Sequence, residues 1–364
     1  MTGGSHTPRV SVIVCTYNGA HVVTGAIDSV LAQTCPDFEL LVCDDDSGDG
    51  TVAVARAAGR GDRRVRVLAT VRHVGNAANR SRAVRAAHGA HVMFVDQDDT
   101  IDPTCLADHL ALIEGSAGLA FTFARRRLAV GAVGDAATIG RSGTSEREAG
   151  ARQADDSGRD DADRPGTDDS VTGDGALHAW AAAHAAPHLA LADLSAINSG
   201  AGIVERLLAA NLDVNPIGEP TGVLIRRAAL AQAGLFNRRL VQILDLDLWL
   251  RLAATGDVGF VDAELATRAV TAGTATARNR AGRDDWLDRL WMLEGLRERG
   301  DLWRREPRLP RMLARERRSV VAATVTGRFR TARLRDALAD DARYGAYLLT
   351  RRLTPERAPL VERL

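Results

Sequence analysis

The chain has 364 residues, 45% of them hydrophobic and 26% charged, which suits a folded protein with a buried core. Its 47 basic and 47 acidic residues cancel, so the overall charge gives no attraction to nucleic acid and we expect no such partner. Every basic residue is arginine. Without lysine, a Walker A phosphate loop and Schiff-base catalysis are excluded, because both need that amine.

The cysteines and the first residues indicate a reducing, cytoplasmic location. The four cysteines lack the CxxC or paired-histidine spacing of a zinc site. Residues 1–8 contain no apolar run of the kind found in a signal peptide, so we expect none. No stretch approaches the roughly 18–20 apolar residues of a membrane-spanning helix.

Residues 10–123 alternate short apolar runs with alanine-rich stretches of helical length. Strands are predicted at 10–14, 38–43, 65–69 and 91–95, and helices at 20–33, 51–59 and 76–88. Runs that are apolar on both faces indicate a parallel sheet covered by helices on both sides, hence an α/β fold. The loops that follow parallel strands share one edge of the sheet, where ligands bind in such folds.

The alternation of apolar runs and helical stretches is absent from residues 131–175. Between 142 and 175 there are ten acidic residues against four arginines, a net charge of −6. A segment with so few large apolar side chains cannot offset its ordering entropy, so we predict a disordered insertion.

Regular patterns return after residue 176. Helices are predicted at 203–210, 227–233 and 243–254, and strands at 222–225 and 258–261. Residues 283–364 read as helical throughout, with thirteen arginines against four acidic residues between 297 and 335, a net charge of +9. These helices could contact an anionic membrane surface as a peripheral anchor, or pack on the preceding domain.

Two acidic clusters follow predicted strands. Asp44, Asp45 and Asp46 come after the strand at 38–43, and Asp96, Asp98 and Asp99 come after the strand at 91–95. Like charges crowded at a sheet edge repel, and a divalent cation would relieve the repulsion. Oxygen ligands on a short open turn suit Mg²⁺ or Mn²⁺. Helix capping is the alternative for an aspartate at such a junction.

Four motifs together carry a family resemblance: VSVIVCTYN (10–18), SVLAQT (29–34), FELLVCDDDSGDGT (38–51) and FVDQDD (94–99). Their order and spacing resemble the family 2 glycosyltransferases of GT-A fold, and the similarity continues through residues 222–236 and 244–256. The resemblance implies a Rossmann-like, mostly parallel sheet flanked by helices. It implies a GT-A domain over 1–275, including the insertion, followed by an arginine-rich helical region over 276–364.

The resemblance also implies a donor site for a nucleoside diphosphate sugar, most often UDP-linked. Thr16, Tyr17 and Asn18 would lie against the base, and Asp45 would accept a hydrogen bond from it. In the DxD motif, Asp96 would contact the ribose.

Asp98 of the same motif would hold the Mg²⁺ or Mn²⁺ that bridges the diphosphate. Asp99 is expected only to cap the helix that follows. The histidines, His73 among them, match no ligand spacing and are expected in the surface or core.

The family's catalytic base lies in a Glu-Asp pair that opens a helix, which assigns the role to Asp245. Here the pair reads Leu244-Asp245, so the glutamate is missing. Asp247 and Arg251 stand at i,i+4 and are predicted to pair, which leaves Asp245 without a local cation. Capping of the helix by Asp245 is the alternative. The Arg-x-His of the family is also incomplete, because Val270 stands in place of the histidine.

The expected activity is inverting transfer of a sugar to a hydroxyl of a glycan, lipid-linked or small-molecule acceptor, as in polysaccharide biosynthesis. The alternative is a catalytically degenerate protein of the same fold that binds a nucleotide sugar or glycan without turnover. A DxDxT phosphatase is disfavoured by the missing lysine. A dehydrogenase is disfavoured because no GxGxxG follows the first strand.

Overall fold

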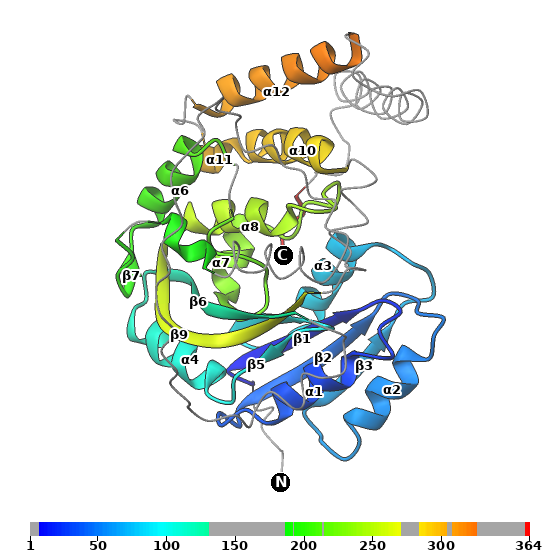
Figure 1. Cartoon of the computed structure of the whole chain (residues 1–364). Helices are drawn as coiled ribbons and strands as arrows, with labels where there is room; N and C mark the ends of the chain where they lie inside the picture. Colours follow the sequence, from blue (N-terminus) through cyan, green and yellow to red (C-terminus); the bar gives the residue numbers. More distant parts are fainter. Residues whose placement is uncertain are drawn as a thin grey trace, which may run out of the picture.

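The computed structural model describes residues 7–130, 186–191, 193–212, 215–270, 284–303, 308–325 and 361–364. Over these residues the chain forms a nine-stranded mixed sheet with helices on both faces (Figure 1). The strand order is β3-β2-β1-β4-β8-β6-β9-β5, and β7 pairs with β9. The predicted insertion at 131–175 lies outside the described residues, as do parts of the predicted helical tail.

The first half of the sheet is parallel. Its strands are β1 (Val10–Thr16), β2 (Phe38–Asp44), β3 (Val65–Ala69) and β4 (His91–Asp96), joined by α1 (Val23–Leu31), α2 (Thr51–Ala58) and α3 (Asn76–Ala86). These elements confirm the strands and helices predicted for this stretch. In the register, Cys15 of β1 pairs with Cys43 of β2 and with Asp96 of β4. The carboxyl ends of these three strands therefore lie together at one edge.

The second half adds antiparallel pairings. Its elements are β5 (Thr100–Ile101), α4 (Cys105–Gly115), β6 (Leu119–Val130), η3 (Pro187–Ala190), β7 (Ile197–Asn198), α6 (Gly200–Ala209), β8 (Val223–Arg226), α7 (Arg227–Ala233), α8 (Leu244–Ala253) and β9 (Asp257–Val270). Strand β8 runs antiparallel between β4 and β6, whereas β6 and β9 pair in parallel. This arrangement places the loop before β8 next to the end of β4.

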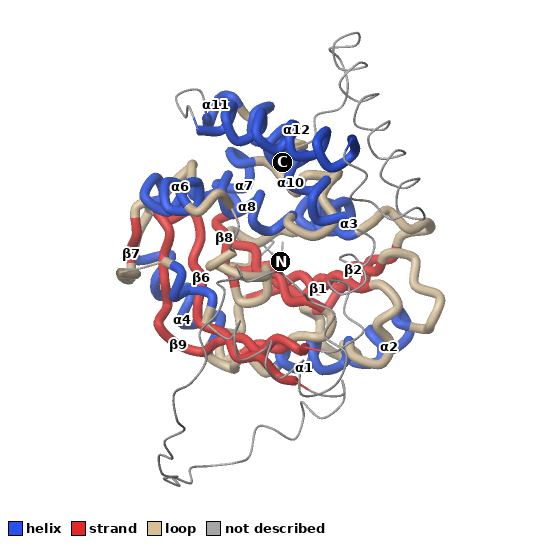
Figure 2. Tube along the Cα trace, turned by 45° about the horizontal axis from the view of Figure 1, so that its top comes forward, coloured by secondary structure: helices blue, strands red, loops and turns tan. Residues whose placement is uncertain are grey.

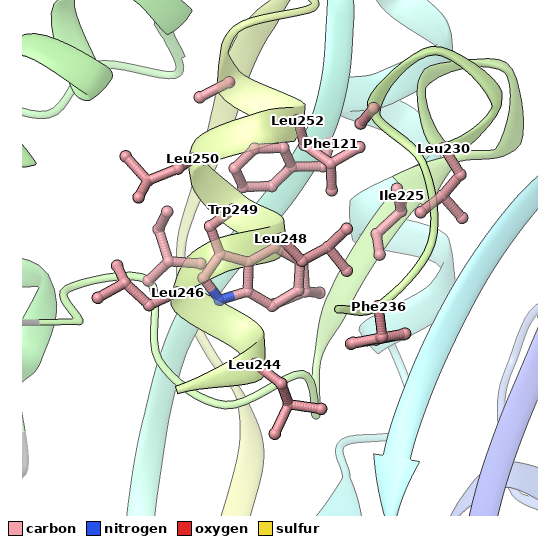
Figure 3. Close-up of a cluster of buried hydrophobic side chains, with 14 of the residues drawn as sticks. Phe121, Ile225, Leu230, Phe236, Leu244, Leu246, Leu248, Trp249, Leu250 and Leu252 are labelled. Carbon is pink, nitrogen blue, oxygen red and sulfur yellow. The ribbon is translucent and has the colours of Figure 1, made fainter. Parts of the chain in front are cut away.

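Side-chain alternation divides the apolar core between the two faces of the sheet. Val12 and Met93 pack with α1 and α4 on one face, whereas Ile13 and Phe94 pack with α3, α6, α7 and α8 on the other. All ten residues of α8 are buried. Figure 3 shows Trp249 of this helix among the leucines and phenylalanines of the second face.

The C-terminal helices form an outer layer beyond α8, as Figures 1 and 2 show. They are α10 (Asp284–Glu298), α11 (Gly300–Trp303) and α12 (Arg308–Val325), and α10 contacts both α8 and α12. Leu290 and Met312 join the same apolar cluster as α8, so these helices pack on the sheet domain. Among the described residues, no helix has the length and apolar character needed to span a bilayer.

Candidate functional site

The loop after β1 is tied to the loop after β2. The amide of Asn18 donates to Ser47 Oγ at 2.8 Å, and Asn18 Oδ1 accepts from the amide of Gly48 at 3.0 Å. Asn18 has a positive φ of 50°, a conformation that asparagine tolerates better than most residues. Thr16 is buried, and its hydroxyl has no hydrogen-bond partner among the described residues, whereas Tyr17 is 47% exposed. Among Thr16, Tyr17 and Asn18, the residues assigned to the base, Tyr17 therefore presents an aromatic ring to solvent.

Asp45 lies directly after β2 and is only 2% exposed. Its Oδ1 accepts from the amide of Val74 and its Oδ2 from the amide of Gly75, each at 2.8 Å. The Nδ1 atom of His73 lies 3.0 Å from Oδ2, and the His73 ring lies against Tyr17 with centroids 4.3 Å apart. The structure thus brings Asp45 and Tyr17 together and adds His73, which the sequence did not indicate.

The DxD motif follows β4 at the same edge. Asp96 Oδ1 accepts from Arg80 Nη2 at 2.5 Å. Gln97, between the two aspartates, accepts from the amide of Tyr17 at 3.0 Å, so the motif adjoins the β1 loop. A Cβ atom at Gly19 would lie 2.3 Å from Gln97 Oε1, so a larger residue there would displace the Gln97 side chain.

Asp98 is partly buried. Burial raises its pKa, the charge of Asp96 raises it further, and the guanidinium of Arg268 partly offsets both. Within the described part of the chain, no cluster of three or more His, Cys, Asp or Glu side chains could hold a metal ion. A cation here would therefore depend on one or two carboxylates together with oxygen atoms of a ligand.

The prediction that Asp99 caps the next helix is wrong. Helix α4 begins after Thr104 and has no side-chain cap. Asp99 is 3% exposed and instead accepts from Thr221 Oγ1 at 2.6 Å and from the amide of Ala269 at 3.1 Å. Burial raises the pKa of Asp99 well above its usual range, and the neighbouring aspartates add to the shift. Asp99 therefore holds the loop before β8 and the end of β9 against the DxD motif.

Asp245 is the second residue of α8. The residue that caps this helix is Ile243, so Asp245 is not the N-cap. Its Oδ1 accepts from the amide of Leu246 at 2.9 Å, and its Oδ2 accepts from Asn215 Nδ2 at 3.0 Å. Burial raises the pKa of Asp245 to about 7, and the negative charge of Glu219 contributes to the same shift.

Two arginines link Asp245 electrostatically to the DxD motif. The charge of Arg80, which is bonded to Asp96, lowers the pKa of Asp245. On the other side, Arg268 lies 2.6 Å from Glu219, whose charge raises the pKa of Asp245. The same Arg268 lowers the pKa of Asp98. Asp245 and the aspartates of the DxD motif therefore share charged neighbours, although they are far apart in the sequence.

The predicted ion pair in α8 is confirmed. Arg251 Nη2 lies 2.6 Å from Asp247 Oδ2, and both side chains are fully buried. Arg251 also donates to the carbonyl oxygens of Ala233 and Gly234. This pair fastens α8 to the end of α7, and among the described residues Asp245, the other carboxyl of the first turn, has no ion-pair partner.

The sequence reading missed several residues of this site: Arg80, His73, Asn215, Glu219 and Thr221. The last three lie in the loop 215–222, whose prolines and glycines indicate a turn and nothing about what it faces. In α3, Asn79, Arg80 and Ser81 are all nearly inaccessible, and this burial of polar residues is visible only in the structure.

Comparison with known proteins identifies relatives of this chain. The family model described as glycosyl transferase family 2 matches residues 11–133. An uncharacterised protein of Mycobacterium tuberculosis is 30% identical over 291 residues, which cover 79% of this chain and 76% of that protein. The Escherichia coli UDP-Glc:alpha-D-GlcNAc-diphosphoundecaprenol beta-1,3-glucosyltransferase WfgD is 40% identical over 90 residues, which cover 25% of this chain and only 35% of that enzyme.

Among solved structures, the mannosyltransferase PcManGT from Pyrobaculum calidifontis, in complex with GDP-Man and Mn²⁺, superposes with a TM-score of 0.50 at 17% identity. The superposition covers 98% of this chain and 86% of that one, which supports a shared fold. The chain therefore belongs to glycosyl transferase family 2 and is a glycosyltransferase of the GT-A type.

Proposed function

We propose that this enzyme transfers a sugar, with inversion, from a nucleoside diphosphate sugar to a hydroxyl of a glycan or lipid-linked acceptor. One observation carries the proposal: Asp245, a buried carboxyl with a pKa of about 7, shares charged neighbours with the DxD motif. Two relatives support the substrate class. WfgD is named for a UDP-linked donor and a diphosphoundecaprenol-linked acceptor, and PcManGT was solved with GDP-Man.

The donor would lie across the carboxyl ends of β1, β2 and β4. The exposed ring of Tyr17 offers a stacking surface for the base, with Thr16 and Asn18 shaping the same loop. Asp45 would accept from the base, and Asp96, which Arg80 holds in place, would contact the ribose. We prefer UDP as the nucleotide.

The residues present fit Mg²⁺ or Mn²⁺. Asp98 has a carboxylate crowded by Asp96, and a cation would relieve that repulsion. Mg²⁺ in particular is usually held by one or two carboxylates, waters and substrate phosphates, so a larger protein ligand set is not needed. When bound, the cation would neutralise charge that develops on the nucleoside diphosphate leaving group.

Asp245 would act as the general base. Its carboxylate would take the proton of the acceptor hydroxyl while the hydroxyl oxygen bonds to the anomeric carbon. The bond from that carbon to the diphosphate oxygen breaks on the opposite face, which inverts the configuration. Because burial raises the pKa of Asp245 to about 7, the carboxylate is more basic than an exposed aspartate. The side-chain amide of Asn215 would hold this carboxylate in one orientation.

The C-terminal helices would bring the enzyme to an anionic membrane surface. In α12, Arg308, Arg311, Arg315 and Arg318 recur at intervals of three and four residues, which places them on one helical face. Arg311, Arg315 and Arg318 are exposed. Juxtamembrane arginines attract acidic lipids, so this face would keep the enzyme close to a lipid-linked acceptor.

A screen of nucleotide sugars tests the proposal. UDP-, GDP- and dTDP-sugars are added with Mn²⁺ or with EDTA, and the thermal midpoint of unfolding is measured. A ligand that binds the folded state raises the midpoint, so we expect metal-dependent stabilisation by one nucleotide class. Donor hydrolysis with the same nucleotide sugar then tests turnover.

The degenerate binding protein is the second candidate, because buried Leu244 replaces the glutamate of the Glu-Asp pair. Stabilisation that does not need metal, without any hydrolysis of the donor, would favour that candidate. Stabilisation by none of the nucleotide sugars would contradict the donor site itself.

A further inference from the structure

Groups of the protein surround the carboxylate of Asp45. An ionised carboxylate has about four positions for accepting hydrogen bonds. Oδ1 faces the Val74 amide at 2.8 Å and the Thr70 hydroxyl at 3.4 Å. Oδ2 accepts from the Gly75 amide at 2.8 Å and lies 3.0 Å from His73 Nδ1, which also lies 3.3 Å from the backbone carbonyl oxygen of Asp45. The Asp45 side chain is only 3% exposed, so a base that binds it has to displace one of these groups.

Three of these four donors are fixed in place. Two are backbone amides of adjoining residues, Val74 and Gly75. Thr70 is held by its own amide, which donates to the carbonyl of Asp44 at 3.1 Å. The fourth donor differs, because the His73 side chain is 52% exposed and can leave by rotating about its side-chain bonds.

The same imidazole also covers part of Tyr17. Its ring centroid lies 4.3 Å from that of Tyr17, at an interplanar angle of 43°. His73 therefore occupies two positions at once: an acceptor site on Asp45, and a place against the ring that would stack on a base.

We propose that His73 is a displaceable cover over the base-recognition site, and that the donor's base binds by taking its place on Asp45 and Tyr17. The inference rests on the proposed function of these two residues. A base that replaces the imidazole must itself donate an N–H to the carboxylate. Uracil, thymine and guanine carry an imino N–H on the base-pairing edge, whereas cytosine has an acceptor nitrogen there and offers only its exocyclic amino group. The cover thus favours a base with an imino N–H.

The test compares substitutions at His73 by titration calorimetry with UDP and GDP, each in the presence of Mn²⁺. His73→Phe keeps a ring beside Tyr17 but cannot donate to Asp45, and His73→Ala removes both contacts. His73→Gln keeps a donor and is the matched control. We expect His73→Phe and His73→Ala to bind the preferred nucleotide about fivefold more tightly, because one competing hydrogen bond is lost. We expect His73→Gln to bind like the wild type, and CDP to gain nothing from any substitution.

Unchanged or weaker binding in both His73→Phe and His73→Ala would overturn the proposal, as would an equal gain for CDP. Asp45→Asn in the same titration separates this failure from failure of the donor site. If Asp45→Asn abolishes binding while the His73 variants gain nothing, only the cover is wrong. If Asp45→Asn binds like the wild type, the assignment of Asp45 to the base is wrong as well.

Discussion

The hydroxyl oxygen of Thr221 lies 2.6 Å from Oδ2 of Asp99. The same oxygen accepts from the amide of Asp96 at 3.0 Å. One threonine thus fastens the loop before β8 to residues on both sides of Asp98. The loop that carries Glu219 and Asn215 is positioned against the DxD motif by this contact.

Replacing Thr221 with valine should destabilise the protein and weaken donor binding. The change leaves Oδ2 of the buried Asp99 carboxylate without its Thr221 donor and the Asp96 amide without an acceptor, so the free energy of unfolding should fall by about 1–3 kcal/mol. Urea denaturation measures that loss. Thr221→Ser keeps the hydroxyl and is the control; equal stability of the two variants would argue against the contact.

The pH dependence of donor turnover should follow the carboxyl of Asp245. A general base must be deprotonated, so turnover should rise with pH through the Asp245 pKa of about 7. Glu219 contributes to the raised pKa, so Glu219→Gln should lower it and move the acid limb to lower pH. A pH–rate profile of donor hydrolysis checks both points. An acid limb that stays in place in Glu219→Gln would rule out this electrostatic link.

The buried pair Asp247–Arg251 should behave as a unit. Removing one partner, as in Asp247→Asn or Arg251→Met, leaves an uncompensated buried charge and should cost about 3–5 kcal/mol. The double variant Asp247→Asn with Arg251→Met should cost clearly less than the two single changes added together. Chemical denaturation of the four proteins gives the coupling energy. Additive losses would show that the two side chains do not stabilise one another.

Vesicle binding should depend on the exposed arginines of α12. Arg311→Gln combined with Arg318→Gln removes two charges and should weaken binding to vesicles rich in anionic lipid by about thirtyfold, at about 1 kcal/mol per arginine. The control is Arg56→Gln combined with Arg60→Gln, which changes the net charge equally at exposed positions in and just after α2. Co-sedimentation with anionic vesicles at low salt measures the binding of both double variants. Equal losses in the two variants would mean that α12 has no special part in binding.

The sequence predicted the elements with a clear apolar pattern. The four parallel strands, the helices between them and the Asp247–Arg251 pair all follow from short-range spacing. Strand β6 was not predicted. In its second half arginines interrupt the apolar pattern, and two of them pair with acidic residues of β9, Arg125 with Asp262 and Arg127 with Glu264. Hydropathy does not reveal a strand whose partners are charged.

The sequence predicted only part of the candidate site, because some of its contacts join residues that are far apart in the chain. Aspartates after apolar strands are visible in a sequence, because parallel strands must end at one edge. Asp99 was misread because its partners, Thr221 and Ala269, lie more than a hundred residues away. Arg80 was not singled out, since an arginine in a helix is normally solvent-exposed and only tertiary packing buries it.

In the proposed reaction, Asp245 removes the acceptor's proton opposite a donor held by the DxD motif. The most direct measurement is turnover by Asp245→Asn of the nucleotide sugar found in the screen, with Mn²⁺ and at a pH above 7. We predict that this variant keeps the wild-type dissociation constant for the donor while turnover falls by about 10²–10⁴-fold, the usual contribution of a general base. Wild-type turnover in Asp245→Asn would contradict the account.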